Sequence, residues 1–356
     1  PHCRTPLTAS RFRHAGLPAR SAGHRVDQRE NRQRVTVQTT LWRNAGNGLV
    51  GTAARHYSSP VPTAAGNAFI PSMSAMLASF DRQLLAFAAP PHLQGWRRGL
   101  LEFWMFGIKE ARACLFAALF FSAVILVPRT GLFGLPRYDV LLLAALAIQG
   151  WMLWAKLETA DEVKAICLFH AIGFLLELFK TSSGIRSWSY PDAAYTKVFG
   201  VPLFSGFMYA AVGSYMIQAW RLFDLRIRHH PPHALATLVA LGIYANFFTH
   251  HYIGDYRWHL AALAAGLFAR TTVTFRPLDR DRTMPLLLAF VLIGFFVWLA
   301  ENISTFFVVW RYPNQLGAWA TVHLGKWSSW SLLVVMTFAI VVQLKHIKRR
   351  IHIPRD

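Results

Sequence analysis

Two acidic residues lie at the ends of long apolar segments, where a charge is costly. Glu177 follows residues 165–176 and Glu301 follows residues 285–300, and His170 is the single ionisable side chain in these two segments apart from Cys167. Ionisable groups inside a bilayer are expensive unless they are paired or hydrated. A desolvated carboxyl group is also well suited to proton transfer. We therefore predict that Glu177 or Glu301 acts as a catalytic acid or base.

Polar side chains near other predicted helix ends extend this candidate site. His250, at the end of another apolar segment, is the third catalytic candidate. The candidates for orienting a substrate or a water are His170, Lys180, Trp188, Tyr190, Asn246, His251, Asn302 and Asn314. Because His170 and Glu177 are seven residues apart, they share one helix face, which we expect to point inward.

Several of these residues also have a purely structural interpretation. Glu177 and Lys180 have the spacing of an i, i+3 ion pair, and His170 is suited to an interhelical hydrogen bond. Adjacent helical residues point about 100° apart, so we expect His250 and His251 not to share a metal. At least one of them is expected to cap the helix or to extend towards the interface.

Other chemistry-bearing patterns are weak in this sequence. Membrane di-iron hydroxylases need several His-rich boxes, and no serine is tied by its sequence context to a His and an acid. No P-loop or dinucleotide fingerprint occurs. We predict no metal site and assign no cofactor. The inner run Glu158, Asp161, Glu162 and Lys164 is predicted to be a solvated loop and helix start rather than a site.

The composition is typical of a membrane protein. Apolar residues make up 54% of the 356 residues and charged residues 15%, against roughly 25% charged in an ordinary soluble domain. The net charge is +20, and after the leader the basic residues lie between apolar runs instead of clustering on one polar face. We therefore expect membrane lipid and a lipophilic small molecule as partners, and no nucleic acid.

The predicted fold is all-α, a polytopic transmembrane bundle of about eight helices. The predicted spans are 111–127, 140–155, 165–179, 201–220, 234–248, 258–269, 285–300 and 327–344. With both termini inside, the inner segments from residue 73 onward hold 19 Lys and Arg and the outer loops 8. If the short sixth segment does not cross, these totals become 12 and 15, so the positive-inside rule favours eight crossings.

Four regions follow from this pattern: a basic leader at 1–72, an amphipathic interfacial segment at 73–110, the bundle at 111–345 and a basic inner tail at 346–356. The leader has ten arginines, no lysine and no methionine. It resembles either a mitochondrial transit peptide or upstream translation before a start at Met73 or Met76, and we favour the second. The expected location is accordingly the bacterial inner membrane, or the mitochondrial inner membrane if the leader is a transit peptide. Gly206, Ala210 and Ser214, four residues apart, predict close helix packing.

Several stretches together resemble an uncharacterised bacterial integral-membrane family, domain of unknown function 817 (DUF817), also called YoaT-like. They are FGIKEARAC (106–114), ELFKT (177–181), SWSYP (187–191), GVPLFSGFMYA (200–210), ANFFTHHY (245–252), WLAEN (298–302) and YPNQ (312–315). The resemblance implies the membrane fold over about residues 100 to 345 and implies no particular reaction.

A shorter stretch, from Glu177 to Leu203, is similar to membrane carotenoid hydratases, although Ser187-Trp188 departs from their pattern. This local similarity implies a lipophilic, isoprenoid type of substrate. Our first hypothesis is therefore a membrane-embedded enzyme on such a substrate, with its polar site at the outer end of the bundle. A small-solute or proton-coupled transporter and a non-catalytic scaffold or sensor are the alternatives.

Overall fold

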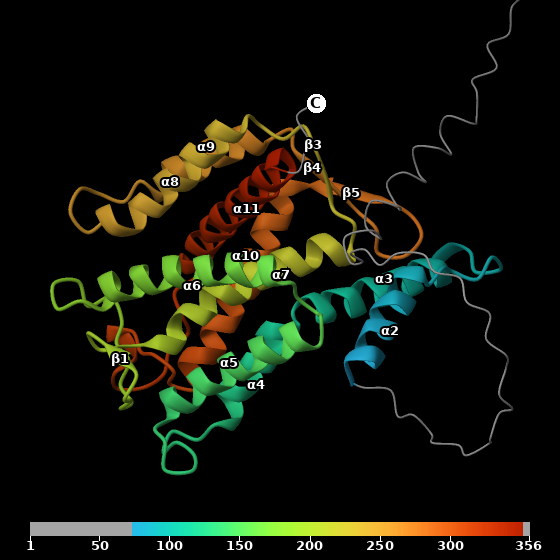
Figure 1. Cartoon of the computed structure of the whole chain (residues 1–356). Helices are drawn as coiled ribbons and strands as arrows, with labels where there is room; N and C mark the ends of the chain where they lie inside the picture. Colours follow the sequence, from blue (N-terminus) through green and yellow to red (C-terminus); the bar gives the residue numbers. More distant parts are fainter. Residues whose placement is uncertain (1–72, 352–356) are drawn as a thin grey trace, which may run out of the picture. The chain divides into compact units, whose positions relative to one another are not determined.

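The computed structural model describes the backbone of residues 73–351 and the side chains of residues 79–346. The predicted leader and residues 352–356 of the predicted tail lie outside this range. The α-helices are α2 (Met73–Ala86), α3 (Gly95–Ala113), α4 (Leu115–Leu126), α5 (Arg137–Trp154), α6 (Ala160–Thr181), α7 (Gly206–Leu222), α8 (His233–Thr249), α9 (Arg257–Phe268), α10 (Leu286–Phe306) and α11 (Lys326–Ile351) (Figure 1). Short 3-10 turns occur at η1 (Leu203–Ser205) and η2 (Pro313–Gln315).

The protein is mostly helical, and each of the eight predicted spans contains a helix. Among the described residues, α10 and the part of α11 from Lys326 to His346 are long and apolar enough to cross a membrane. Helices α4 and α8 are apolar but shorter. The number of membrane crossings therefore remains a prediction.

Two small antiparallel sheets correct the prediction of an all-α fold. Strands β1 (Lys197–Val198) and β2 (Val201–Pro202) form one, and β3 (Arg226–Arg228), β4 (Thr272–Phe275) and β5 (Arg282–Pro285) form the other in that order. Arg226 pairs with Thr274, and Thr272 pairs with Pro285. These strands escaped the sequence analysis because they are two to four residues long and lie in basic loops between apolar segments.

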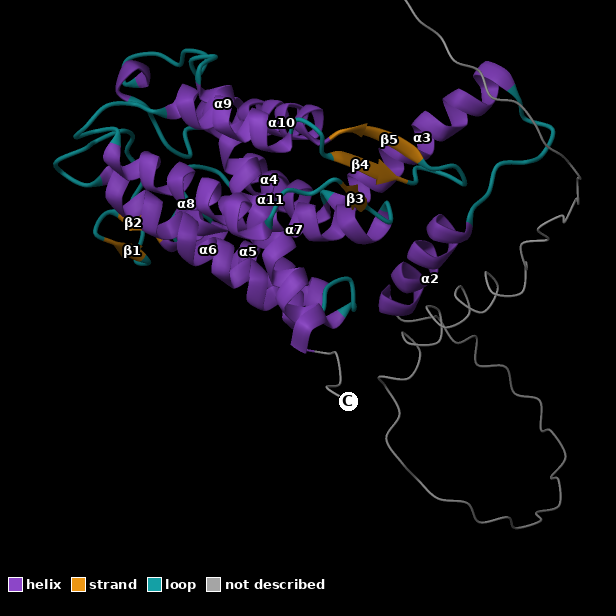
Figure 2. Ribbon diagram, turned by 90° about the horizontal axis from the view of Figure 1, so that it is seen from above, coloured by secondary structure: helices purple, strands orange, loops and turns teal. Residues whose placement is uncertain are grey.

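The three-stranded sheet holds the ends of several helices together. Strand β3 precedes α8 and β4 follows α9, so the two helices form a hairpin whose open end is closed by the sheet, and β5 leads into α10. Figure 2 shows the sheet beside α3, to which it is joined by the ion pair of Glu102 with Arg282 and by a hydrogen bond from the Lys109 ammonium to the Arg276 carbonyl.

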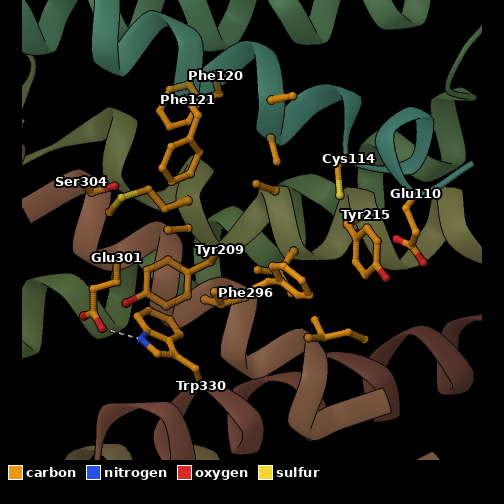
Figure 3. Close-up of a pocket in the computed structure, with 18 of the residues that line it drawn as sticks. Glu110, Cys114, Phe120, Phe121, Tyr209, Tyr215, Phe296, Glu301, Ser304 and Trp330 are labelled. Atoms are coloured by element: carbon orange, nitrogen blue, oxygen red, sulfur yellow. Dashed lines mark hydrogen bonds between the residues drawn. The ribbon is translucent and has the colours of Figure 1, made fainter. Parts of the chain in front are cut away.

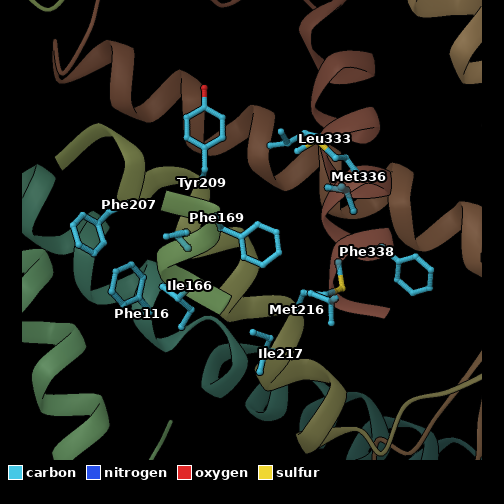
Figure 4. Close-up of a cluster of buried hydrophobic side chains, with 14 of the residues drawn as sticks. Phe116, Ile166, Phe169, Phe207, Tyr209, Met216, Ile217, Leu333, Met336 and Phe338 are labelled. Atoms are coloured by element: carbon cyan, nitrogen blue, oxygen red, sulfur yellow. The ribbon is translucent and has the colours of Figure 1, made fainter. Parts of the chain in front are cut away.

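Helix α11 provides the middle of the apolar core. Its residues Val334 and Phe338 are 0% and 2% exposed. The Phe338 ring packs against Phe290 at 5.2 Å and against Phe268 at 6.1 Å between centroids. Figure 4 shows Phe338 among the buried side chains, together with Met336 of the same helix and Met216 of α7.

Helices α6 and α7 pack closely, as the small residues every four positions predicted. A Cβ atom built on Gly206 would lie 2.6 Å from the His170 imidazole, and one on Gly213 would lie 2.2 Å from the Phe169 ring. Ala210 and Ser214 are fully buried in the same interface. The packing prediction is confirmed, because only very small side chains leave room for the opposing rings.

Glu158 corrects the prediction of a solvated inner loop. It is 2% exposed, and its carboxylate accepts hydrogen bonds from the Ser214 hydroxyl at 2.6 Å and from the side-chain amides of Gln149 and Gln218 at 2.5 and 3.3 Å. The neighbouring helix start is as predicted, since Thr159 and Glu162 form a capping box. The polar partners of Glu158 come from α5 and α7, which no local pattern reveals.

We expect Gly213→Ala to lower the thermal unfolding temperature of the purified protein. The added methyl group overlaps the Phe169 ring, and overpacking of this kind costs about 1–3 kcal/mol. Gly150→Ala is the matched control, because a Cβ at this exposed position of α5 meets no atom within 4 Å and should gain helix propensity. Equal unfolding temperatures for the two variants would contradict the close packing of α6 and α7.

Candidate functional site

Glu177 is buried in the last turns of α6 and is held by three aromatic donors. Its carboxylate accepts hydrogen bonds from the Trp188 indole N–H and the Tyr190 hydroxyl, both at 2.8 Å, and from the Tyr209 hydroxyl at 2.9 Å. Trp188 and Tyr190 belong to the loop after α6, whereas Tyr209 lies in α7. Both carboxylate oxygens are therefore satisfied without a cation in direct contact.

Glu301 has the same kind of environment near the end of α10. It is 3% exposed and accepts hydrogen bonds from the Tyr312 hydroxyl and from the Trp330 indole N–H, the latter at 2.7 Å. Glu301 has no basic neighbour in the sequence, so its hydrogen-bond partners must come from elsewhere in the chain. The partners come from the loop after α10 and from α11.

The two acids belong to one polar region, because their donors pack against each other. The ring centres are 6.0 Å apart for Trp188 and Tyr312 and 6.4 Å apart for Tyr209 and Trp330. Lys326 is the nearby cation, with its ammonium 4.7 Å from the centre of the Tyr312 ring and 5.5 Å from that of Trp188. Burial, and then the charge of the adjacent carboxylate, raises the pKa of Tyr312 well above its usual range. The same two causes raise the pKa of Tyr190. Both phenols therefore stay protonated and remain hydrogen-bond donors to the acids.

An apolar cavity of about 730 Å³ leads from these two acids along the bundle. Residues of α3, α4, α7 and α10 line it, with Phe120 and Phe121 on one side and Phe296 on the other (Figure 3). Glu301 and Trp330 are at one end of the view, and Glu110 and Tyr215 are at the opposite end. The cavity thus joins an apolar binding volume to two carboxylates that share one polar region.

Lys180 and the two histidines form a separate polar cluster, which corrects two predictions. The Lys180 ammonium lies 3.2 Å from His250 Nε2 and 2.8 Å from His251 Nε2, so Lys180 does not pair with Glu177. The imidazoles converge, with ring centres 4.0 Å apart. They do so because α8 ends at Thr249, so that the 100° helical rotation does not apply to His251. The expected helix-end role is found for His250, whose Nδ1 lies 2.8 Å from the Asn246 carbonyl.

The remaining predicted binding residues lie away from the cavity lining. Asn246 holds the loop after α8 through Asp255 and the Tyr256 backbone N–H, and Asn302 accepts from the Val322 backbone N–H at 2.9 Å. Asn314 is exposed. These positions have structural contacts in the described chain, and a substrate role for them remains a prediction.

His170 does not form the interhelical hydrogen bond that we expected. Its buried Nδ1 has no hydrogen-bond partner among the described residues. The imidazole lies 4.6 Å from the Phe207 ring and stacks on Phe174, and Gly206 is the residue of α7 that approaches it. A glycine offers no side-chain acceptor, which explains the missing bond.

Sequence reasoning missed the partners that complete the site. Tyr209 and Trp330 contact the acids, and an aromatic residue in an apolar helix gives no sign that it donates a hydrogen bond. Also missed was Arg137, a fully buried residue that donates to the carbonyls of Val124 and Phe307, both at 2.8 Å. Arg137 thereby joins the C-terminal ends of α4 and α10.

The described residues contain no group of three or more His, Cys, Asp or Glu side chains arranged to hold a metal ion. The His250–His251 pair has Lys180 as its third neighbour, and an ammonium group is not a metal ligand.

Comparisons with known proteins agree with the resemblance found in the sequence. The family model described as "Protein of unknown function (DUF817)" matches residues 102–338. A protein of Bacillus subtilis (strain 168), described as "Uncharacterized protein YoaT", is 49% identical over 253 residues, which cover 71% of this chain and 95% of the relative. No solved structure matches the chain.

We expect the Lys180 cluster to make the protein less stable as the pH falls. Desolvation, and then the Lys180 ammonium, lowers the pKa of His251 to about 4, and desolvation lowers that of His250, with Lys180 contributing. Unfolded histidines titrate at about 6.5, so below that pH the unfolded chain binds more protons and stability declines.

Lys180→Met should make this decline shallower, because it removes the charge that opposes protonation of the histidines. The check is the unfolding temperature measured between about pH 7.5 and pH 5, spanning the ordinary histidine pKa. Lys164→Met, at an exposed position of the same helix, should keep the slope of the parent protein. An unchanged slope in Lys180→Met would show that the ammonium does not control the two imidazoles.

Proposed function

Since the chain belongs to the DUF817 family, whose function is unknown, we propose from its site that it is a membrane-embedded enzyme acting on a lipophilic substrate. The observation that supports this proposal is the cavity: its walls are apolar over most of their length, and two buried carboxylates stand together at one end. An apolar pocket with a few convergent polar groups is the usual form of a site for a lipophilic small molecule.

The proposed chemistry is proton transfer between the substrate and the pair Glu177 and Glu301. One carboxyl group donates a proton to an alkene carbon, and the other carboxylate removes a proton from a neighbouring carbon or from an attacking water. Removal of a proton from the neighbouring carbon moves the double bond, whereas removal of a proton from the attacking water leads to addition of water across the double bond. Isoprenoid lipids carry such alkenes, so they are the substrate class we favour.

The membrane setting is also part of the proposal. Leu235, Leu238 and Leu241 recur every three residues on α8 and are 47%, 65% and 60% exposed, which is the pattern of a helix face in contact with lipid. Leu292 and Phe296 of α10 are exposed and also line the cavity. A lipid could therefore enter from the side, without leaving the bilayer.

Contact with a membrane interface would also explain the amphipathic character of α3, which precedes the bundle. On α3, Trp96 and Phe103 are 74% and 71% exposed, while Lys109 and Arg112 face the protein. Aromatic residues of this kind favour the membrane interface. We place α3 at the inner interface, with both termini on the inner side and the paired acids towards the outer side.

A transporter is less well supported by the geometry. A proton or solute pathway would need polar groups between the paired acids and the inner end. His170, the candidate for that position, is flanked by the rings of Phe174 and Phe207 and has an unsatisfied Nδ1.

We expect Ser183 and Lys156 to lie on opposite sides of the membrane. Both positions are in loops, at the two ends of α6. In a variant without native cysteines, a cysteine at Ser183 should react with a membrane-impermeant maleimide in intact cells, and one at Lys156 only after the cells are opened. Equal labelling of both in intact cells would contradict a crossing by α6.

We expect Glu177→Gln and Glu301→Gln each to abolish the lipid change caused by the gene. Both substitutions keep the size of the side chain and remove the proton-transferring group. The measurement is mass spectrometry of lipid extracts from gene-deleted cells that carry the parent protein or a variant.

Glu162→Gln is the matched control for these two variants, since glutamine also completes a capping box. It should restore the parent lipid profile. A deletion strain whose lipids equal those of the parent strain, or glutamine variants that restore the profile in full, would overturn the enzyme proposal.

A further inference from the structure

We propose that the inner end of the cavity binds the hydroxyl group of an uncharged, single-chain lipid through Glu110 and Tyr215. The inference rests on the proposed function in one respect, that the cavity is the substrate site. It adds the chemical class of the substrate and a second binding position, far along the cavity from the paired acids.

Glu110 and Tyr215 are a polar pair in an otherwise apolar wall. Glu110 lies in α3 and Tyr215 in α7, and both side chains line the cavity. Figure 3 shows both side chains directed towards the cavity, beside Cys114. Both residues also border a second cavity of about 70 Å³, which continues towards Phe275 of the sheet. The Glu110 carboxyl group and the Tyr215 hydroxyl therefore stand at the cavity wall, where a ligand can reach them.

The charge of the lining selects against anionic lipids. Three carboxyl groups, those of Glu110, Glu177 and Glu301, reach the cavity, and the residues that line it include no lysine, arginine or histidine. A phosphate or carboxylate head group would meet only acids and hydroxyls, and an unpaired buried charge is strongly unfavourable. A hydroxyl group instead supplies the proton that a carboxylate accepts.

The length of the cavity suits one extended chain. Its lining along α10 runs from Ala289 to Ser304, and fifteen helical steps correspond to about 22 Å. Phe106 and Gly107 of α3 line the cavity near Glu110, and Trp310 and Tyr312 line it near Glu301. A lipid alcohol bound at Glu110 would place its tail between Phe121 and Phe296 and its far end at Glu177 and Glu301.

The test is equilibrium binding of radiolabelled 1-hexadecanol to the full-length protein in nanodiscs, with hexadecyl methyl ether and hexadecanoic acid as competitors. We expect the alcohol to bind up to about ten-fold more tightly than the ether, because the alcohol alone can donate a hydrogen bond to the carboxyl group. The acid should be the weakest competitor. Glu110→Leu should bind the alcohol and the ether equally, and Glu110→Gln should admit the acid.

Asp161→Asn, which also removes an acid but at an exposed site outside the cavity, should leave all three affinities unchanged. Retained binding of the ether by Glu110→Leu shows that the variant is folded. The inference is overturned if the parent protein binds none of the probes, if it binds alcohol and ether equally, or if Glu110→Leu keeps the preference.

These outcomes are independent of the proposed reaction. The assay measures binding and not the reaction. It can therefore succeed even if Glu177→Gln and Glu301→Gln restore the parent lipid profile, and it can fail even if both variants abolish the lipid change. The first result would disprove the enzyme proposal alone, and the second would disprove only the assignment of Glu110.

Discussion

The burial of two carboxylates among aromatic donors is the constraint on which the rest of the site depends. Each acid needs its oxygens satisfied, because a buried polar group without a partner costs several times what a formed hydrogen bond contributes. Glu177 obtains its donors from the loop after α6 and from α7, and Glu301 obtains its donors from the loop after α10 and from α11. The acids therefore fix four helices and two loops relative to one another.

The sequence predicted the helices and the positions of the acids well, for a physical reason. Apolar runs and charged interruptions are local properties, so Glu177 and Glu301 stood out by their positions alone. Recognition of the family is confirmed by the match over residues 102–338 and by the bacterial relative. The short strands were missed because a strand of three residues has no period to detect.

What the sequence could not predict are contacts that join distant elements. Glu158 was predicted to be solvated because it begins a run of charged residues, yet its partners in α5 and α7 bury it. The two histidines were predicted to diverge because the end of α8 could not be placed to within one residue. Both predictions were wrong, because contacts between distant elements decided the outcome.

Arg137 connects two helices that line the cavity. Its guanidinium group joins the Val124 carbonyl near the end of α4 to the Phe307 carbonyl just after α10. These two helices are opposite walls of the cavity, so Arg137 joins the walls at the C-terminal ends of both helices. At the other end of α4, the helical path is interrupted at Cys114, between α3 and α4. The walls are therefore tied together at one end of the cavity, and a chain seated between them would be held most firmly there.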